Sequence, residues 1–238
     1  MKEKFDYTTY ALFYFLLIGI LLIAVMAADR MIIQTNADSS VLRNCLIIDA
    51  GHGGEDGGAV SCTGVYESVI NLQIALKLHD LLALLGYDTM LTRTDDGDLH
   101  QNGATIAQRK ASDLRHRVQI ISVAKAPILI SIHQNYFADS RYSGAQVFYA
   151  STHGSETLAQ ILQNALSTGM PSASRRLATK SKGVFLMENI QCTGVLIECG
   201  FLSNKQEEAL LRDHTYQNKI CCIIAAGLCD YLDRQEIS

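Results

Sequence analysis

From residue 44 onward, the sequence alternates short apolar runs with longer stretches in which apolar residues recur at helical spacing. The apolar runs predict strands over 44–49, 87–93, 128–133, 145–150 and 195–198, and Pro127 opens the third of them. The periodic stretches predict helices over 66–85, about 104–125, 153–168 and 204–232, the last as one or two helices. We therefore expect an α/β fold, a three-layer sandwich of a mostly parallel, twisted sheet with helices on both faces.

The first expected helix shows its period most clearly. One apolar stripe is formed by Ile70, Ile74, Leu78, Leu81 and Leu85, and Gly86 follows its end. By contrast, 170–183 lacks any apolar period and is expected to be a loop.

The composition is that of an ordinary globular protein. The 238 residues are 48% hydrophobic and 18% charged, enough to bury a core, and we find no repeat or low-complexity tract. The formal net charge is −4, so no overall positive field attracts nucleic acid. We expect one compact domain that does not bind nucleic acid.

The first 28 residues are predicted to lie outside that domain. Lys2 and Lys4 precede an uncharged, apolar stretch over 7–28, which has the length of a long signal-peptide core or a short membrane anchor. Either alternative implies export across the cytoplasmic membrane, with the protein secreted or membrane-anchored through this segment alone. We expect 29–43 to be a linker and 44–238 to be the folded domain.

Seven cysteines, an odd number, include no C-x-x-C pair, which argues against a zinc knuckle or redox motif. Several lie in apolar runs, where a free thiol behaves as a small hydrophobic group, so a disulfide framework is the weaker expectation. Cys199 lies beside Glu198, which raises a thiol-hydrolase alternative, but the sequence offers no Cys-His-Asn context for it.

Polar residues follow the expected strands where ligands of α/β sheets bind, beyond the carboxyl ends. His52, His133 and Glu198 each end or follow a strand, and Glu67 opens the first helix, where the helix dipole favours a carboxylate. Two imidazoles and one carboxylate form a catalytic zinc set that leaves a fourth position for water. These residues are therefore the candidate site.

The loop around His52 contains five glycines, at 51, 53, 54, 57 and 58. They allow tight turns and keep side-chain bulk away from a metal, so that a large substrate can approach. A phosphate-binding loop does not fit, because Asp56 and Ala59 stand where those motifs need glycine and lysine. The H-E-x-x-H and G-x-S-x-G motifs are absent as well.

Four blocks, "DAGHGGEDGGA", "YESVINLQIALKL", "SIHQN" and "VLIECGFLSN", occur in an order and spacing that resemble the zinc-dependent N-acetylmuramoyl-L-alanine amidases of the amidase-3 type. The similarity covers about residues 44 to 233. It implies one zinc ion per chain, bound by His52, Glu67 and His133, with Glu198 as the catalytic acid/base. The implied reaction is hydrolysis of the amide between N-acetylmuramic acid and L-alanine in peptidoglycan.

Some positions depart from the family pattern: Pro127 replaces a usual aspartate, Gln134 a small residue, and Thr193-Gly194 a common proline. None removes a ligand. We expect Gln134 and Asn135, beside a ligand, and Arg175 and Arg176, in a basic loop, to contact substrate, the arginines through stem-peptide carboxylates.

As a small, exported, single-domain chain, the protein most resembles the spore-cortex, germination-specific amidases of endospore-forming bacteria. That resemblance implies removal of stem peptides so that muramic-δ-lactam forms in the cortex, and a place in the forespore intermembrane space. Vegetative cell-wall turnover and a non-catalytic peptidoglycan-binding module are the alternatives. Since no wall-binding repeat or regulatory helix is evident, we also expect an activating partner protein in the same compartment.

Overall fold

The computed structural model describes residues 44–97, 102–170 and 176–236. Along the chain, the elements are β1 (Cys45–Ala50), α2 (Glu67–Leu84), β2 (Thr89–Leu91), α3 (Ile106–Val123), β3 (Pro127–Asn135), β4 (Gln146–Tyr149), α4 (Ser155–Gly169), β5 (Thr179–Lys180), α5 (Phe185–Asn189), β6 (Thr193–Phe201), α6 (Lys205–Leu211) and α7 (His214–Glu236). The expected leader or anchor over 1–28, the expected linker over 29–43 and Arg175 lie outside the described residues. Within those ranges, no helix has both the length and the apolar character to cross a membrane.

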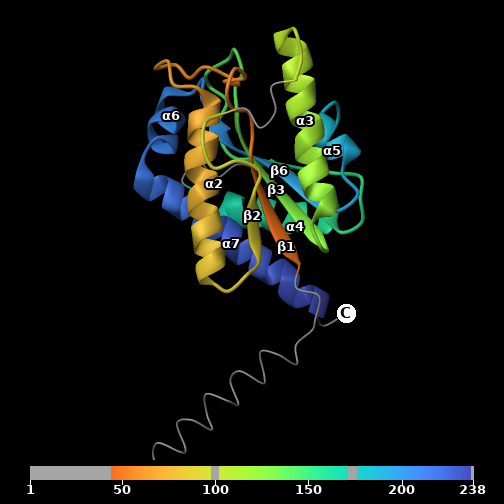
Figure 1. Ribbon diagram of the computed structural model, residues 1–238. Helices are drawn as coiled ribbons and strands as arrows, with labels where there is room; N and C mark the ends of the chain where they lie inside the picture. The colour runs from red at the N-terminus through yellow and green to blue at the C-terminus, as the bar shows by residue number, and fades with distance from the viewer. Residues whose placement is uncertain (1–43, 98–101, 171–175, 237–238) are drawn as a thin grey trace, which may run out of the picture. The chain divides into compact units, whose positions relative to one another are not determined.

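The six strands form one sheet in the order β2-β1-β3-β6-β4-β5 (Figure 1). All neighbouring strands run parallel except β4 and β6, which pair antiparallel. Helices α2, α4 and α7 cover one face of this sheet, and α3 and α5 cover the other. The expected three-layer α/β sandwich is confirmed.

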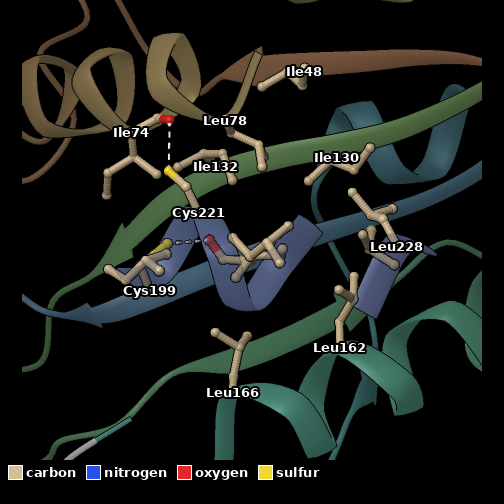
Figure 2. Packing of buried hydrophobic residues seen from close by; sticks show 14 of the residues in the cluster. Ile48, Ile74, Leu78, Ile130, Ile132, Leu162, Leu166, Cys199, Cys221 and Leu228 are labelled. Carbon is tan, nitrogen blue, oxygen red and sulfur yellow. Dashed lines mark hydrogen bonds between the residues drawn. The ribbon is translucent and has the colours of Figure 1, made fainter. Parts of the chain in front are cut away.

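Strand periodicity divides the core between the two faces. On β1 and β3, the even-numbered residues, such as Ile48, Ile130 and Ile132, pack under α2 and α7 together with Ile74 and Leu78 (Figure 2). The odd-numbered residues Ile47 and Leu129 face α3 and α5. Fully burying each such side chain contributes about 1.5–3 kcal/mol, so both faces of the two central strands are fixed by packing.

The structure differs from the sequence expectations in local detail. The buried stripe of α2 ends at Leu82, which is fully buried, whereas Leu81 is only partly buried and Leu85 is 53% exposed. The helix ends there because Gly86 adopts a left-handed backbone with φ +87°. Short elements were missed: β5 lies within the expected loop, and α5 has only five residues, too few to show a period.

A buried ion pair connects β1 to α3, which lies on the sheet face opposite to α2. Arg117 of α3 is 2% exposed and donates from Nη1 to Asp49 Oδ1 at 2.6 Å, at the carboxyl end of β1. Asp49 also accepts hydrogen bonds from Thr92, after β2, and Ser131 of β3. One carboxylate therefore joins three neighbouring strand ends to α3. Burial would raise the pKa of Asp49, but Arg117 and the two hydroxyl donors outweigh it and lower the pKa to about 2.

The same guanidinium supports the backbone that leaves β1. Arg117 donates to the carbonyl oxygens of Ala50 (2.7 Å) and His52 (2.6 Å). A second buried arginine, Arg93, donates to the carbonyls of Ala50, Gly51 and Ser68. Two arginines thus satisfy carbonyls at the end of β1 and at the start of the following loop, and Arg93 also connects them to α2.

Replacing Arg117 by methionine should lower the free energy of unfolding by about 3–5 kcal/mol, because the Asp49 carboxylate would remain buried without its partner. The measurement is urea unfolding of the purified full-length chain. Arg141→Met, which removes an 89% exposed arginine paired with Asp139, is the matched control and should change little.

The pH dependence gives a second readout of the same pair. Because the folded pKa of Asp49 lies below its ordinary value of 3.8, its stabilising effect is complete above about pH 4 and is lost as the pH falls toward 2. The stability difference between wild type and Asp49→Asn should shrink over that window. A difference that stays constant from pH 6 to pH 2.5 would contradict this account.

Candidate metal centre

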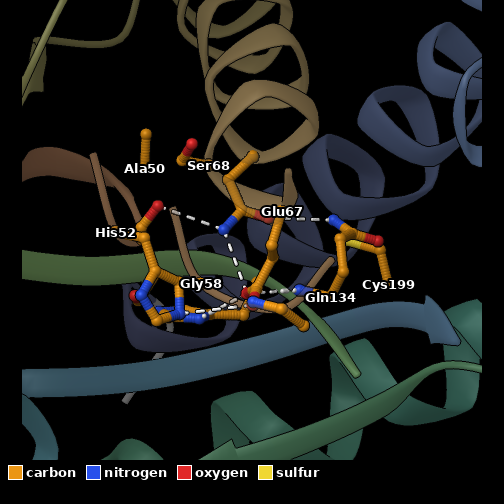
Figure 3. A network of polar contacts seen from close by, with 12 residues as sticks. Ala50, His52, Gly58, Glu67, Ser68, Gln134 and Cys199 are labelled. Carbon is orange, nitrogen blue, oxygen red and sulfur yellow. Dashed lines mark hydrogen bonds and ion pairs between the residues drawn. The ribbon is translucent and has the colours of Figure 1, made fainter. Parts of the chain in front are cut away.

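Three side chains from separate elements meet at the carboxyl edge of the sheet. His52 follows β1, His133 lies near the end of β3, and Glu67 opens α2. His52 Nε2 lies 3.3 Å from Glu67 Oε2, and His133 Nδ1 lies 3.0 Å from Glu67 Oε1 (Figure 3). One ligand atom from each residue lies within 4.8 Å of the others, so one metal ion can contact all three. The sequence prediction of these three residues as one cluster is confirmed.

Glu67 is held as an anion at the centre of this cluster. Its side chain is 5% exposed, and its oxygens accept hydrogen bonds from the Asn71 amide and from the backbone N–H groups of Ala59 and Gln134. Burial would raise the pKa of Glu67, but His133 and His52 outweigh it and hold the pKa well below its usual range. The carboxylate is therefore fixed in both charge and orientation.

His52 has an unusual backbone for a residue with a side chain, with φ +60°. This left-handed conformation costs about 1–2 kcal/mol in an L-residue, and the Arg117 contact with the His52 carbonyl helps to maintain it. On its other side, His52 Nδ1 lies 2.9 Å from Asp56 Oδ2. Burial would lower the pKa of His52, but Asp56 and Glu67 outweigh it and raise the pKa to about 9 in the absence of metal.

The glycines leave space against the ligand side chains. A Cβ atom at Gly51 would collide with the His133 ring, and one at Gly58 would collide with Glu67 Oε2 and His52. Gly58 also adopts φ +68°, a conformation that favours glycine. The loop is therefore shaped to the three ligand groups, and the donor set of two imidazoles and one carboxylate suits zinc.

Glu198 faces the same cluster from the neighbouring strand. It pairs in register with His133 across β3 and β6, so both side chains lie on one face of the sheet. Its Oε2 is buried and has no hydrogen-bond partner among the described residues. Burial raises the pKa of Glu198 to about 7. A carboxyl group of this kind can both accept and return a proton near neutral pH.

Of the residues expected to contact substrate, Gln134 is placed differently. It is 3% exposed and donates to Asn71 Oδ1 at 3.2 Å, and Figure 3 shows it beside Cys199, away from His52. The reason is the strand period: Gln134 follows His133 and so points to the α2 face. The Gln134 side chain is therefore directed away from the metal cluster, where its amide contacts Asn71 and its backbone N–H contacts Glu67. Its contact with substrate stays a prediction.

Asn135 and Arg176 remain near the site. Asn135 is half-buried at the end of β3, where the register with β6 shifts. Arg176 donates to Gln146 Oε1 at 2.8 Å, and Gln146 is the β4 register partner of Glu198. The Arg176 guanidinium lies over the Phe201 ring, 4.8 Å from its centroid.

Several supporting residues escaped the sequence analysis. Asp56, Asn71, Arg93 and Arg117 each contact a ligand residue or the loop that carries it. Asp56 has a detectable signal, since it lies four residues after His52 in the glycine loop. The arginines have none, because an arginine after a strand, such as Arg93, or in a polar helix, such as Arg117, usually lies in solvent.

The thiol-hydrolase alternative finds no support in the geometry. Cys199 lies on the face opposite to Glu198, in the core beneath α2 and α7, and is 1% exposed (Figure 2). Burial raises the pKa of its thiol far above the ordinary value, so the reactive thiolate is disfavoured. All seven cysteines are free thiols.

Comparison with known proteins gives a consistent result. A family model described as N-acetylmuramoyl-L-alanine amidase matches residues 46–230. The germination-specific N-acetylmuramoyl-L-alanine amidase of Bacillus subtilis is 38% identical over 188 residues, which cover 78% of each chain.

Solved structures agree with this result. The CwlD amidase from Clostridioides difficile, solved in complex with the GerS lipoprotein, is 39% identical with a TM-score of 0.77, and the match covers 80% of this chain and 98% of that one. The catalytic domain of the amidase CwlV from Bacillus (Paenibacillus) polymyxa is 31% identical with a TM-score of 0.68 and the same coverage. These relatives are named as amidases, which favours an enzyme over a non-catalytic binding module.

Proposed function

The chain belongs to the N-acetylmuramoyl-L-alanine amidase family, and on this premise we propose that it cleaves the muramoyl–L-alanine amide of peptidoglycan with one zinc ion at His52, Glu67 and His133. The observation that carries the proposal is the buried, unpartnered Glu198 Oε2 on the strand beside His133. It supports the proposal because metal-assisted amide hydrolysis requires a proton acceptor next to the metal ligands.

Zinc bound at this site would polarise the scissile carbonyl and lower the pKa of water. The protein supplies the other components. Glu67 and the two histidines hold the ion, and Glu198 accepts a proton from the attacking water at its unpartnered Oε2. Glu198 then returns that proton to the leaving L-alanine nitrogen, since its pKa near 7 suits both directions of transfer. The products are a lactyl carboxylate on muramic acid and a free stem peptide.

Beside this centre, we propose that Asn135, Arg176 and Arg175 bind the substrate. Arg176 supports this directly, because its contact with Gln146 brings a cation beside the strand position of Glu198. An arginine there pairs with the carboxylates of a stem peptide.

We further propose that the enzyme removes stem peptides from spore cortex, so that muramic-δ-lactam forms. The germination-specific relative from Bacillus subtilis supports this role, and vegetative wall turnover is the alternative. The place of action follows from the substrate: a compartment outside the cytoplasmic membrane, such as the forespore intermembrane space. The N-terminal 28 residues would act there as a signal peptide or anchor.

An activating partner completes the proposal. The amidase from Clostridioides difficile was solved in complex with a lipoprotein, which supports a partner of the same compartment for this chain. A partner that binds the zinc-loaded state would stabilise it by mass action.

Glu198→Gln should keep zinc, because Glu198 is not a ligand, and should lower the rate of amide hydrolysis about 10²–10⁴-fold, the usual contribution of a general acid/base group. The measurement pairs zinc content with mass spectrometry of digested peptidoglycan. Near-normal release of stem peptides would remove Glu198 from the mechanism.

Arg176→Met should raise KM for peptidoglycan and leave kcat nearly unchanged, because the residue is proposed to pair with a stem-peptide carboxylate and takes no part in proton transfer. Lys180→Met, a change in the same basic segment, is the control. If both variants show the same kinetics as wild type, Arg176 does not bind substrate.

Deletion of the gene should remove muramic-δ-lactam from spore cortex, and the wild-type chain, unlike the Glu198→Gln variant, should restore it. Muropeptide analysis of spores and of vegetative walls distinguishes the two roles. Normal cortex together with altered vegetative walls would favour wall turnover.

The purified chain alone should bind zinc loosely or work slowly, and extract from sporulating cells should raise both zinc affinity and amidase rate. If the chain alone already binds zinc tightly and matches the rate in extract, no partner is needed.

A further inference from the structure

Helix α3 lies on the opposite face of the sheet from α2, yet three of its basic residues reach the glycine loop. Arg117 contacts Asp49 and the His52 carbonyl, as described above. One turn from the helix start, Arg109 binds Glu55, with Nη2–Oε2 at 2.6 Å, and Lys110 binds Asp56, with Nζ–Oδ2 at 2.8 Å. The start of the helix is fixed by a capping box between Thr105 and Gln108.

Only one of the two adjacent ion pairs continues to a ligand of the proposed metal. Asp56 Oδ2, the atom that Lys110 contacts, also lies 2.9 Å from Nδ1 of His52. Glu55, the partner of Arg109, is not part of the His52–Glu67–His133 cluster. Lys110, Asp56 and His52 therefore form a continuous chain of contacts from α3 to the centre.

This chain matches what a metal-binding histidine needs. If Nδ1 donates its hydrogen to a carboxylate, Nε2 is left with its lone pair directed at the metal, and the ring orientation is fixed. Asp56 supplies that carboxylate, and the same oxygen, Oδ2, accepts from Lys110 Nζ at 2.8 Å. Lys110 thus holds the carboxylate in place against the His52 ring.

Because the Lys110–Asp56 pair is partly exposed, a role of Lys110 in metal binding can be distinguished from a role in the stability of the fold. The Lys110 and Asp56 side chains are 47% and 27% exposed, and ion pairs in such positions contribute little to folding. A loss of zinc affinity in a Lys110 variant would therefore not be a result of unfolding.

We propose that Lys110 is a positioning residue for zinc, acting through Asp56 on the His52 ring. The proposal rests on the zinc site of the proposed function and adds to it a residue outside the four blocks that carry the family resemblance. It makes α3 the element that adjusts metal affinity.

The test is the zinc dissociation constant of the metal-free full-length chain, measured by competition with a chromophoric chelator. Lys110→Met should weaken zinc binding about 10-fold, at the lower end of the effect of groups that orient metal ligands. Arg109→Met, the matched control that removes the neighbouring ion pair of the same loop and helix, should change it less than about 2-fold. Lys110→Arg should restore most of the affinity, because a cation again faces Asp56.

A double-mutant cycle tests whether Lys110 acts on zinc binding through Asp56. In an Asp56→Asn background, Lys110→Met should cause no further loss of zinc affinity, because its partner is already neutral. At saturating zinc, Lys110→Met should recover a kcat near that of wild type, and its unfolding midpoint without metal should match that of Arg109→Met.

Three results would overturn the proposal: unchanged zinc affinity in Lys110→Met, an equal loss in Arg109→Met, or a full additional loss in the Asp56→Asn background. Each differs from failure of the proposed function, in which the wild-type chain itself binds no zinc.

Discussion

The buried pair of Asp49 and Arg117 is the interaction on which the site depends. Asp49 joins the ends of β1 and β3 and the residue after β2, and Arg117 carries that connection to α3 and to the carbonyls of Ala50 and His52. A buried pair of this kind adds little to stability compared with apolar residues, but losing one partner is costly. Its benefit is geometric, because it holds a loop without secondary structure in one conformation.

That conformation gives His52 its left-handed backbone and directs its ring toward Glu67. Side chains alternate between the two faces along β3 and β6. His133 and its register partner Glu198 therefore face the site, whereas Gln134 and Cys199 face the core beneath α2 and α7. At this end of β3 and β6, the candidate site and the core beneath α2 and α7 therefore lie on opposite faces of the same strands. The glycines complete the arrangement, because side chains at Gly51 and Gly58 would displace the ligands.

The sequence was sufficient to predict the α/β architecture and the cluster of His52, Glu67 and His133, because strand ends and a helix start are visible in local patterns. It did not predict the role of Arg117. That role depends on the tertiary packing of α3 against the sheet near β1, which no local pattern in the sequence indicates. The orientation of Gln134 was not anticipated for a local reason, since a residue next to His133 in a strand points to the opposite face. Short elements such as α5 were missed because five residues carry no measurable period.

The central claim is that this edge of the sheet is built to hold zinc with two imidazoles and one carboxylate. X-ray absorption spectroscopy at the zinc edge of the zinc-loaded full-length chain tests it most directly. The account predicts one zinc per chain with only nitrogen and oxygen ligands at about 2.0–2.2 Å and the outer-shell scattering of two imidazoles. Sulfur scattering at about 2.3 Å, from any of the free thiols, or the signal of fewer than two imidazoles would contradict it.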